Sequence, residues 1–320
     1  MAIGSVVALA GGVGGAKLAQ GLAEVLGPGK LTVVVNTADD FEHLGLYICP
    51  DLDTVMYTLC DLHNLETGWG LESESWNFLE ALRELGGDTW FRLGDRDLAT
   101  HIERTHRMRS NDKLSDITAD FCAKMGISVR VLPMSDDPVR TMVDTDIGRI
   151  PFQEYFVRLG CSPKVRGFEF EGIENAVFNP LASESLKAQN LKAVIICPSN
   201  PYVSIAPILS LTGVRDQLRD VVAPIIAVSP IVGGQAIKGP AAKMMRELGC
   251  NPSALSVAKE YENVLDGFVI DRSDATEASR IEEIGQRVLI TETIMTSIKV
   301  KKSLARNIMD FANEIKVRDI

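Results

Sequence analysis

Residues 6–17 of the chain read VVALAGGVGGAK, and this stretch decides the fold class. A short apolar run typical of a buried strand ends in four glycines, and a helical pattern begins at Ala16. Glycine adopts positive φ without strain and lets an anion approach the backbone, while a helix N-terminus adds positive potential. The stretch therefore predicts a strand, a tight turn and a helix that bind a phosphate or diphosphate. The expected contacts are Gly11, Gly12, Gly14, Gly15 and Lys17.

Two common nucleotide-binding motifs do not fit this glycine loop. The glycines are not spaced as G-x-G-x-x-G, and Lys17 is followed by Leu18 rather than by the Ser or Thr of a P-loop. The spacing disfavours a dinucleotide dehydrogenase and a Walker ATPase. A tight turn whose glycines serve only close packing is the simpler alternative.

Strand-like runs alternate with helical segments along most of the chain. They lie at residues 6–10, 31–36, 129–132, 193–197, 225–229, 267–270 and 288–291. Continuous Val and Ile runs separated by amphipathic helices are typical of a parallel sheet with helices on both faces. The pattern predicts an α/β protein with a Rossmann-like, mostly parallel sheet.

Two segments interrupt this alternation. Residues 61–126 are polar with helical periodicity and predict a helical lid. Residues 140–179 contain runs that alternate with period two and predict a small antiparallel element. We therefore expect a core of residues 1–60 and 190–320 that carries the phosphate-binding loops. The helical and small α+β insertion is expected at 61–189.

Composition narrows the class of partner. The chain has 320 residues, of which 46% are hydrophobic and 24% charged, as in a soluble globular protein. A net charge of -10 disfavours nucleic acid and anionic membranes, and no run reaches the ~18 apolar residues that span a bilayer. We expect small-molecule substrates and no nucleic acid or membrane partner, and a homodimer is left as an option.

Cysteine and histidine spacing argues against structural metal or disulfide sites. The six cysteines contain no C-x-x-C, and the four histidines contain no H-E-x-x-H. His101 and His106 lie five residues apart on an expected helix, so a histidine metal site is not expected. Reduced thiols fit a cytoplasmic protein.

Acidic side chains follow the second expected strand and open a helix. Residues 36–40 read NTADD, and residues 49–55 read CPDLDTV, where proline suits a helix start. Open α/β sheets bind ligands at the carboxyl ends of strands, so these carboxylates should lie opposite the glycine loop. Carboxylates facing phosphates can hold Mg²⁺, whereas helix caps and solvated turns are the alternative. The aspartates concerned are Asp39, Asp40, Asp51 and Asp53.

Polar and aromatic groups mark two further segments. Residues 90–97 read WFRLGDRD, in which Arg92 either clamps a phosphate or pairs with Asp95 or Asp97. Residues 132–137 read LPMSDD and place a serine and two carboxylates at a strand end.

Two later loops also suit a nucleotide. Residues 197–204 read CPSNPYVS, so prolines hold Ser199 and Asn200 where they can read a nucleobase or ribose edge. Residues 229–240 read SPIVGGQAIKGP and predict a second phosphate-type loop before a helix.

Together these motifs resemble the CofD family, the 2-phospho-L-lactate transferases of deazaflavin coenzyme F-420 biosynthesis. The resemblance runs from residue 11 to about 245. The segments that carry it are GGVGGAK (11–17), NTADD (36–40), PDLDT (50–54), RLGDRD (92–97), PSNP (198–201) and IVGG (231–234).

The resemblance implies a magnesium-dependent group transfer. Lactyl-2-diphospho-5'-guanosine would donate 2-phospho-L-lactate to the ribityl hydroxyl of 7,8-didemethyl-8-hydroxy-5-deazariboflavin. GMP would be released and F-420 without glutamate (F-420-0) formed. Some relatives use a phosphoenolpyruvate-derived donor, and the sequence leaves that option open.

Roles for individual residues follow from the motifs and the resemblance. We expect Asp53, helped by Asp51, to be catalytic, and Asp53 and Asp39 to hold Mg²⁺. The expected deazaflavin contacts are Asp53, Arg92, Asp39 and Ser135. The expected contacts to the guanosine diphosphate, besides the glycine loop and Lys17, are Ser199, Asn200, Gly233, Gly234 and Lys238.

Two other functions remain alternatives. A nucleotide-sugar-binding regulatory protein of the YvcK-like type would share the glycine loop and the NTADD segment. A nucleotide-dependent oxidoreductase would need G-x-G-x-x-G and a later acidic residue, which are missing. The lid and residues 90–97, which suit a flat deazaflavin, favour the transferase.

Overall fold

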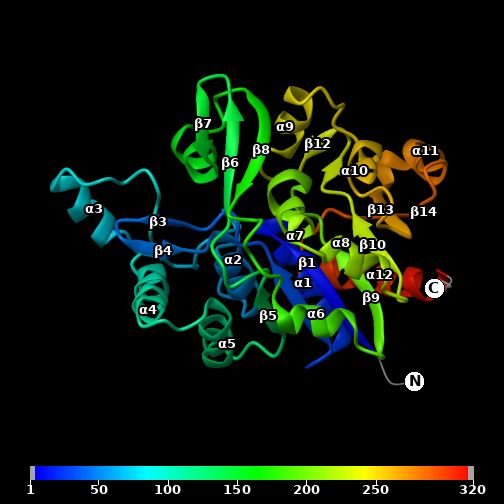
Figure 1. The fold of residues 1–320 in the computed structure, drawn as a ribbon, viewed down its shortest axis with the longest axis horizontal. Helices are drawn as coiled ribbons and strands as arrows, with labels where there is room; N and C mark the ends of the chain where they lie inside the picture. Colours follow the sequence, from blue (N-terminus) through cyan, green and yellow to red (C-terminus); the bar gives the residue numbers. More distant parts are fainter. Residues whose placement is uncertain (1–3, 316–320) are drawn as a thin grey trace.

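The computed structural model describes residues 4–315, and a parallel sheet forms its centre (Figure 1). Within those residues the sheet has seven strands in the order β14-β13-β10-β9-β1-β2-β5, and neighbouring strands run parallel. The strands are β1 (Ser5–Ala10), β2 (Leu31–Val35), β5 (Arg130–Pro133), β9 (Leu191–Ile196), β10 (Ile225–Val228), β13 (Gly267–Asp271) and β14 (Arg287–Thr291). Each matches a predicted strand to within two residues, so the predicted α/β Rossmann-like fold is confirmed.

Helices cover both faces of the sheet because neighbouring strand residues point to opposite sides. In β1, Val6 and Ala8 pack under one set of helices, while Val7 and Leu9 pack under the other. The first set comprises α1 (Gly12–Leu26), α2 (Pro50–Leu59), α5 (Leu114–Lys124) and α12 (Ile298–Glu314). The second comprises α6 (Pro180–Leu186), α7 (Ala206–Ser210), α8 (Val214–Arg219), α9 (Ala241–Glu247), α10 (Ala254–Glu260) and α11 (Ala278–Glu282).

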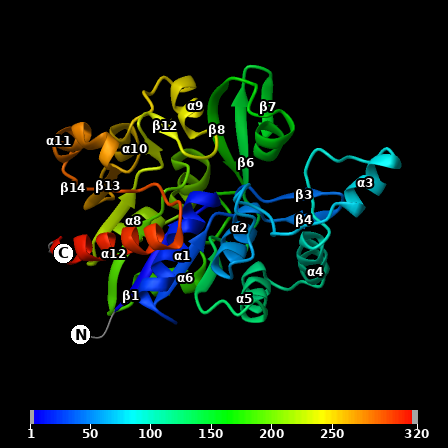
Figure 2. The same ribbon diagram turned by 180° about the vertical axis from the view of Figure 1, so that it is seen from behind.

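The last helix, α12, packs on its own chain. Figure 2 shows it beside α1, and Leu304, Ile308 and Phe311 are buried in the core on that face. None of the helices within residues 4–315 combines the length and the apolar character needed to cross a membrane.

A lid, residues 61–113, extends from one end of the sheet. It carries α3 (Asn77–Glu84), which projects away from the body in Figure 1, and α4 (Asp97–Arg109). Its aliphatic Leu93 and Leu98 pack with Ile48 of the hairpin β3 (Phe41–His43) and β4 (Leu46–Ile48).

Two carboxylates set where the lid helices begin. Asp95 accepts hydrogen bonds from the backbone N–H groups of Asn77 and Phe78 at the start of α3, both 3.0 Å. Glu74 accepts from the N–H groups of Arg96 and Asp97 at the start of α4, at 2.9 and 2.8 Å. Each helix N-terminus is thus capped by a side chain next to the other helix, which holds the two together.

The chain leaves the core twice rather than once. The predicted insertion at 61–189 contains β5, which pairs with β2, and α5, which covers that face of the sheet. The second excursion is an antiparallel small sheet, β6 (Arg140–Thr145), β7 (Gly148–Pro151) and β8 (Val165–Glu171), with a π-helical turn at Glu154–Arg158. One insertion with a single pair of boundaries does not describe the chain, because β5 lies in the core sheet between the two excursions.

Candidate functional site

A cavity of about 670 Å³ opens at the carboxyl end of the parallel sheet. It lies beside β1 and β9, where the strand order changes direction, which is where open α/β sheets bind ligands. The glycine loop, the start of α2, the lid, the small sheet and the loops after β9, β10 and β14 all contribute to its wall. The cavity therefore collects groups from the whole chain.

The glycine loop packs tightly against the loop after β9. The N–H of Gly11 donates to Ser199 Oγ at 3.0 Å, and that hydroxyl donates to the Gly11 carbonyl at 2.8 Å. A Cβ on Gly14 would overlap the Pro198 carbonyl, and one on Gly15 would lie 2.7 Å from Ser199 Oγ. Close packing thus accounts for two of the glycines.

The same packing places the N-terminus of α1 at the cavity. Gly12 begins the helix with φ +61° and lines the cavity together with Val13 and Gly14. The first N–H groups of a helix lack acceptors within it, and the helix dipole is positive there. Packing and anion binding are therefore compatible, and this end of the cavity suits a phosphate.

Two lysines lie at this end of the cavity. Lys17 and Lys238 both line it, and the pKa of Lys17 is lowered, first by burial and then by the charge of Lys238. The Lys238 ammonium also donates to the carbonyls of Glu66 and Thr67 at 3.2 and 2.9 Å. Neighbouring ammonium groups that repel each other are stabilised by an anion between them.

The second glycine-rich segment is a hairpin rather than a phosphate cradle. Gly233 and Gly234 have φ of +58° and +75° and form the two-residue turn between β11 (Ile231–Val232) and β12 (Gln235–Ala236). The Gly233 N–H donates to the Asp274 carboxylate, and neither glycine is among the residues that line the cavity. Only Lys238 of this predicted set reaches the cavity.

Asp39 and Asp51 form a buried carboxyl pair on the cavity wall. Burial raises the pKa of Asp51 to about 6, although hydrogen bonds from Asn36 and Gly12 oppose this. The pKa of Asp39 is raised well above its usual value, first by burial and then by Asp51. Within residues 4–315, Asp39 Oδ1 has no hydrogen-bond partner. Two such carboxyls favour a proton or a cation between them.

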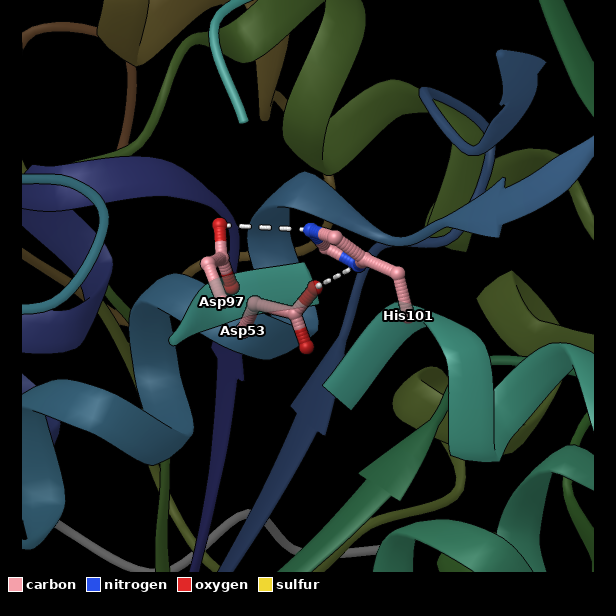
Figure 3. A group of neighbouring side chains, drawn as sticks. All are labelled: Asp53, Asp97 and His101. Carbon is pink, nitrogen blue, oxygen red and sulfur yellow. Dashed lines mark ion pairs between the residues drawn. The ribbon is translucent and has the colours of Figure 1, made fainter. Parts of the chain in front are cut away.

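Asp53 belongs to a second buried cluster, with Asp97 and His101 (Figure 3). The His101 ring lies between the carboxylates, with Nδ1 3.7 Å from Asp53 Oδ2 and Nε2 3.2 Å from Asp97 Oδ2. Tyr57 donates its hydroxyl to Asp97 at 2.6 Å. Burial raises the pKa of Asp53, while the charge of Arg104 opposes that rise. One ligand atom from each of the three clustered side chains lies within 4.8 Å of the others, so they could share a cation.

The sequence motifs do not identify Asp97, His101 and Arg104 as site residues, and the histidine spacing predicts no metal site. The three occur at i, i+4 and i+7 in α4, so they share one helix face. That spacing was the available signal, but it could not say that this face meets Asp53.

The residues present fit a magnesium ion. Mg²⁺ takes oxygen ligands, commonly one or two carboxylates together with substrate phosphates. Among the described residues, Asp39 Oδ1 has no hydrogen-bond partner, and Asp51, Asp53 and Asp97 line the same cavity. The predicted ligands Asp39 and Asp53 fall in separate carboxylate groups of that cavity.

Aromatic side chains form another part of the wall. Trp90 and Phe91 line the cavity and pack edge to face, with ring centroids 5.7 Å apart. Phe152 and Phe156 of the small sheet region stack at 5.4 Å with planes 7° apart. Flat apolar walls of this kind suit a planar ring system.

Arg92 lies at this aromatic wall. Its guanidinium carbon is 4.2 Å from the centre of the Trp76 ring, and the residue lines the cavity. The Asp95 carboxylate accepts hydrogen bonds from backbone N–H groups at the start of α3. Within residues 4–315, Arg92 has no ion pair with Asp95 or Asp97. Arg92 therefore remains available for a ligand.

Of the remaining predicted site residues, two line the cavity and one does not. Ser199 and Asn200 line the cavity, where Asn200 also accepts the Tyr202 N–H at 3.0 Å. Ser135, predicted to contact the deazaflavin, is buried away from the cavity lining. Its hydroxyl donates to the Val177 carbonyl at 2.7 Å and accepts from the Asp137 N–H at 3.1 Å, so it holds a turn.

Asp40 lies behind this site and predicts a pH dependence of stability. Burial raises the pKa of its carboxyl to about 8, against the opposing charges of Arg140 and Arg104. The folded chain therefore keeps a proton that the unfolded chain loses near the ordinary value of 3.8. The free energy of unfolding should fall as the pH rises from about 4 to about 8, by up to ~1.4 kcal/mol per pH unit.

Asp40→Asn should flatten this dependence and stabilise the fold at pH 8, since an amide imitates the neutral carboxyl. Urea denaturation at pH 5 and pH 8, without added metal, measures the effect. Exposed Asp144→Asn is the control. Equal pH slopes in wild type and Asp40→Asn would contradict the assignment.

Residues 6–305 match the model of the family described as 2-phospho-L-lactate transferase CofD. A 2-phospho-L-lactate transferase of Methanosarcina mazei is 39% identical, over 93% of this chain and 97% of that one. A phosphoenolpyruvate transferase of Streptomyces griseus is 38% identical, over 97% and 99%. A solved UPF0052-family protein of Bacillus halodurans has a TM-score of 0.62 at 14% identity, covering 97% of this chain and 99% of that one, and so shares the fold.

Proposed function

The chain belongs to the CofD family of transferases, and on that premise we propose its substrates. It transfers 2-phospho-L-lactate from lactyl-2-diphospho-5'-guanosine to the ribityl hydroxyl of 7,8-didemethyl-8-hydroxy-5-deazariboflavin. GMP leaves and F-420-0 forms. One observation carries the proposal: a single cavity has a helix N-terminus with two lysines in one part and buried carboxylates with aromatic rings in another.

The chemistry is a displacement at phosphorus. The acceptor hydroxyl oxygen bonds to the phosphorus that carries lactate, the bond from that phosphorus to the GMP oxygen breaks, and the hydroxyl proton leaves. Such transfers depend on alignment and on neutralising charge rather than on covalent catalysis. A magnesium ion, when bound, would neutralise diphosphate charge.

Different parts of the cavity bind the donor, activate the acceptor hydroxyl and hold the acceptor ring. The α1 N-terminus, Lys17 and Lys238 bind the diphosphate, while Ser199 and Asn200 contact the guanosine. Asp53 accepts the hydrogen bond of the attacking hydroxyl and receives its proton. The aromatic wall with Arg92 holds the flat acceptor.

The lactyl donor is the primary proposal, with the phosphoenolpyruvate-derived donor as the competing substrate. Relatives with each of these names match most of the chain at similar identity. The aromatic wall beside the carboxylates suits the flat deazaflavin acceptor, and this favours the transferase over a binding protein of the YvcK-like type. A cytoplasmic location and a homodimer stay predictions.

Metal removal provides the first test. Purified protein with Mg²⁺, the deazaflavin and lactyl-2-diphospho-5'-guanosine should release GMP and form the phospholactyl product, followed by mass. EDTA should abolish product formation and excess Mg²⁺ should restore it, because the carboxylates and the diphosphate repel each other without a cation. A parallel reaction with the phosphoenolpyruvate-derived donor ranks the donors. Binding of a nucleotide sugar without turnover of either donor would contradict the proposal.

A further inference from the structure

Arg104 is a buried arginine that reaches Asp53 from outside the cavity. Its side chain is 1% exposed, and it is not among the residues that line the cavity, whereas Asp53 is. Nη1 donates to Asp53 Oδ2 at 3.1 Å, and Nη2 pairs with Oδ1 of the same carboxylate. Arg104 therefore contacts both carboxylate oxygens of Asp53 from the side away from the cavity.

Stability alone is a poor reason for this pair. Burying two charges costs several kcal/mol of desolvation per ion, and well-packed apolar residues often do as well or better. Arg104 also has two further polar neighbours. Its Nη1 lies 3.5 Å from the Tyr47 carbonyl and 3.4 Å from His101 Nδ1. A planar guanidinium fork imposes an orientation on a carboxylate that a point charge cannot impose.

The helix α4 connects the contact between Arg104 and Asp53 to the rest of the site. The helix presents Asp97, His101 and Arg104 on one face, and two of these side chains, His101 and Arg104, lie against Asp53. Its first turn is held by Glu74, which accepts from the backbone at the start of α4. The lid therefore contacts the Asp53 carboxylate as well as lining the cavity.

We propose that Arg104 is a positioning residue that orients the Asp53 carboxylate for the transfer reaction, an inference that rests on the proposed function. A carboxylate has about four lone-pair sites, and the fork takes one on each oxygen. The remaining lone pairs of the Asp53 carboxylate then point in a defined direction at the cavity wall, where the acceptor hydroxyl or a cation can bind to them. A cation without the fork would still oppose the rise of the Asp53 pKa, but it would not fix this orientation.

Arg104→Lys separates orientation from charge. Lysine retains a buried positive charge but cannot form the two-point contact. We expect kcat to fall about a hundredfold, since misplacement of a catalytic group by ~1 Å costs that much, while the KM for the guanosine donor stays unchanged. Arg107→Lys is the matched control, because Arg107 is on the same helix and pairs at the surface with Asp112 and Asp120. Its kinetics should match wild type.

A double-mutant cycle with Asp53→Asn shows whether Arg104 acts through Asp53. Arg104→Lys should cause little further loss in that background, whereas an effect on folding alone would reduce activity equally in both backgrounds. Thermal denaturation and donor affinity measure the folded fraction of each variant.

Each outcome bears on one conclusion. Wild-type kcat in Arg104→Lys, or full additivity with Asp53→Asn, would overturn the positioning role while leaving the proposed transfer intact. A wild-type protein that turns over neither donor would overturn the proposed function and remove the premise of this inference.

Discussion

Asp53→Asn is expected to lower the rate of phospholactyl transfer by about a thousandfold, the middle of the range for losing a general acid or base. Asparagine keeps the size of the side chain but cannot accept a proton, and it presents one oxygen where the aspartate presents two. The position is central, because Asp53 contacts Arg104 and lies next to His101 at the cavity wall. Product formation under saturating Mg²⁺ and both substrates measures the effect.

Loss of folding must be separated from loss of chemistry in this variant. Removing one member of a buried pair leaves the other charge uncompensated and typically costs about 3–5 kcal/mol. Activity is therefore compared per folded protein, with thermal denaturation of wild type, Asp53→Asn and Asp144→Asn side by side. A folded Asp53→Asn protein with undiminished turnover and metal response would remove the proposed role of Asp53.

Gly14→Ala is expected to have the second largest effect, on both stability and donor binding. Its Cβ would overlap the carbonyl of Pro198, which is backbone and cannot rotate away, so α1 or the loop after β9 must move. Overpacking of this kind costs about 1–3 kcal/mol of unfolding free energy. The same movement displaces the α1 N-terminus from the phosphate position, so donor affinity should fall more than tenfold, or more than ~1.4 kcal/mol.

The control for this change is Gly167→Ala in β8. An added Cβ there lies 4.0 Å from its nearest neighbour, and the backbone φ is ordinary. Chemical denaturation and calorimetric titration with GDP compare both variants with wild type. Unchanged GDP affinity in Gly14→Ala would show that the start of α1 does not bind the donor phosphates.

The lid links the two ends of the site through the backbone of its first loop. Lys238, from the phosphate end, donates to the carbonyls of Glu66 and Thr67, and Trp69 of the same loop lines the cavity. The helix α4 that follows carries His101 and Arg104 to Asp53. One excursion from the core thus touches both the proposed donor site and the proposed acceptor site.

The sequence by itself determined the sheet and the turns that open onto the cavity. Strand positions follow from short apolar runs, and the glycine turn and the Pro50 helix start follow from local backbone preferences. These are properties of neighbouring residues, so one chain without a structure suffices to predict them. For the same reason Asp39, Asp51 and Asp53 could be placed at the carboxyl edge of the sheet.

Only the tertiary structure decided which side chains meet. Asp53 and Arg104 are 51 positions apart, and their contact depends on how the lid packs and where α4 begins. Ser135 follows a strand as predicted yet turns away to bond Val177, and Gly233 and Gly234 close a hairpin instead of a phosphate loop. Local preferences specify a turn or a helix face, but the direction that face points depends on burial and packing between distant segments.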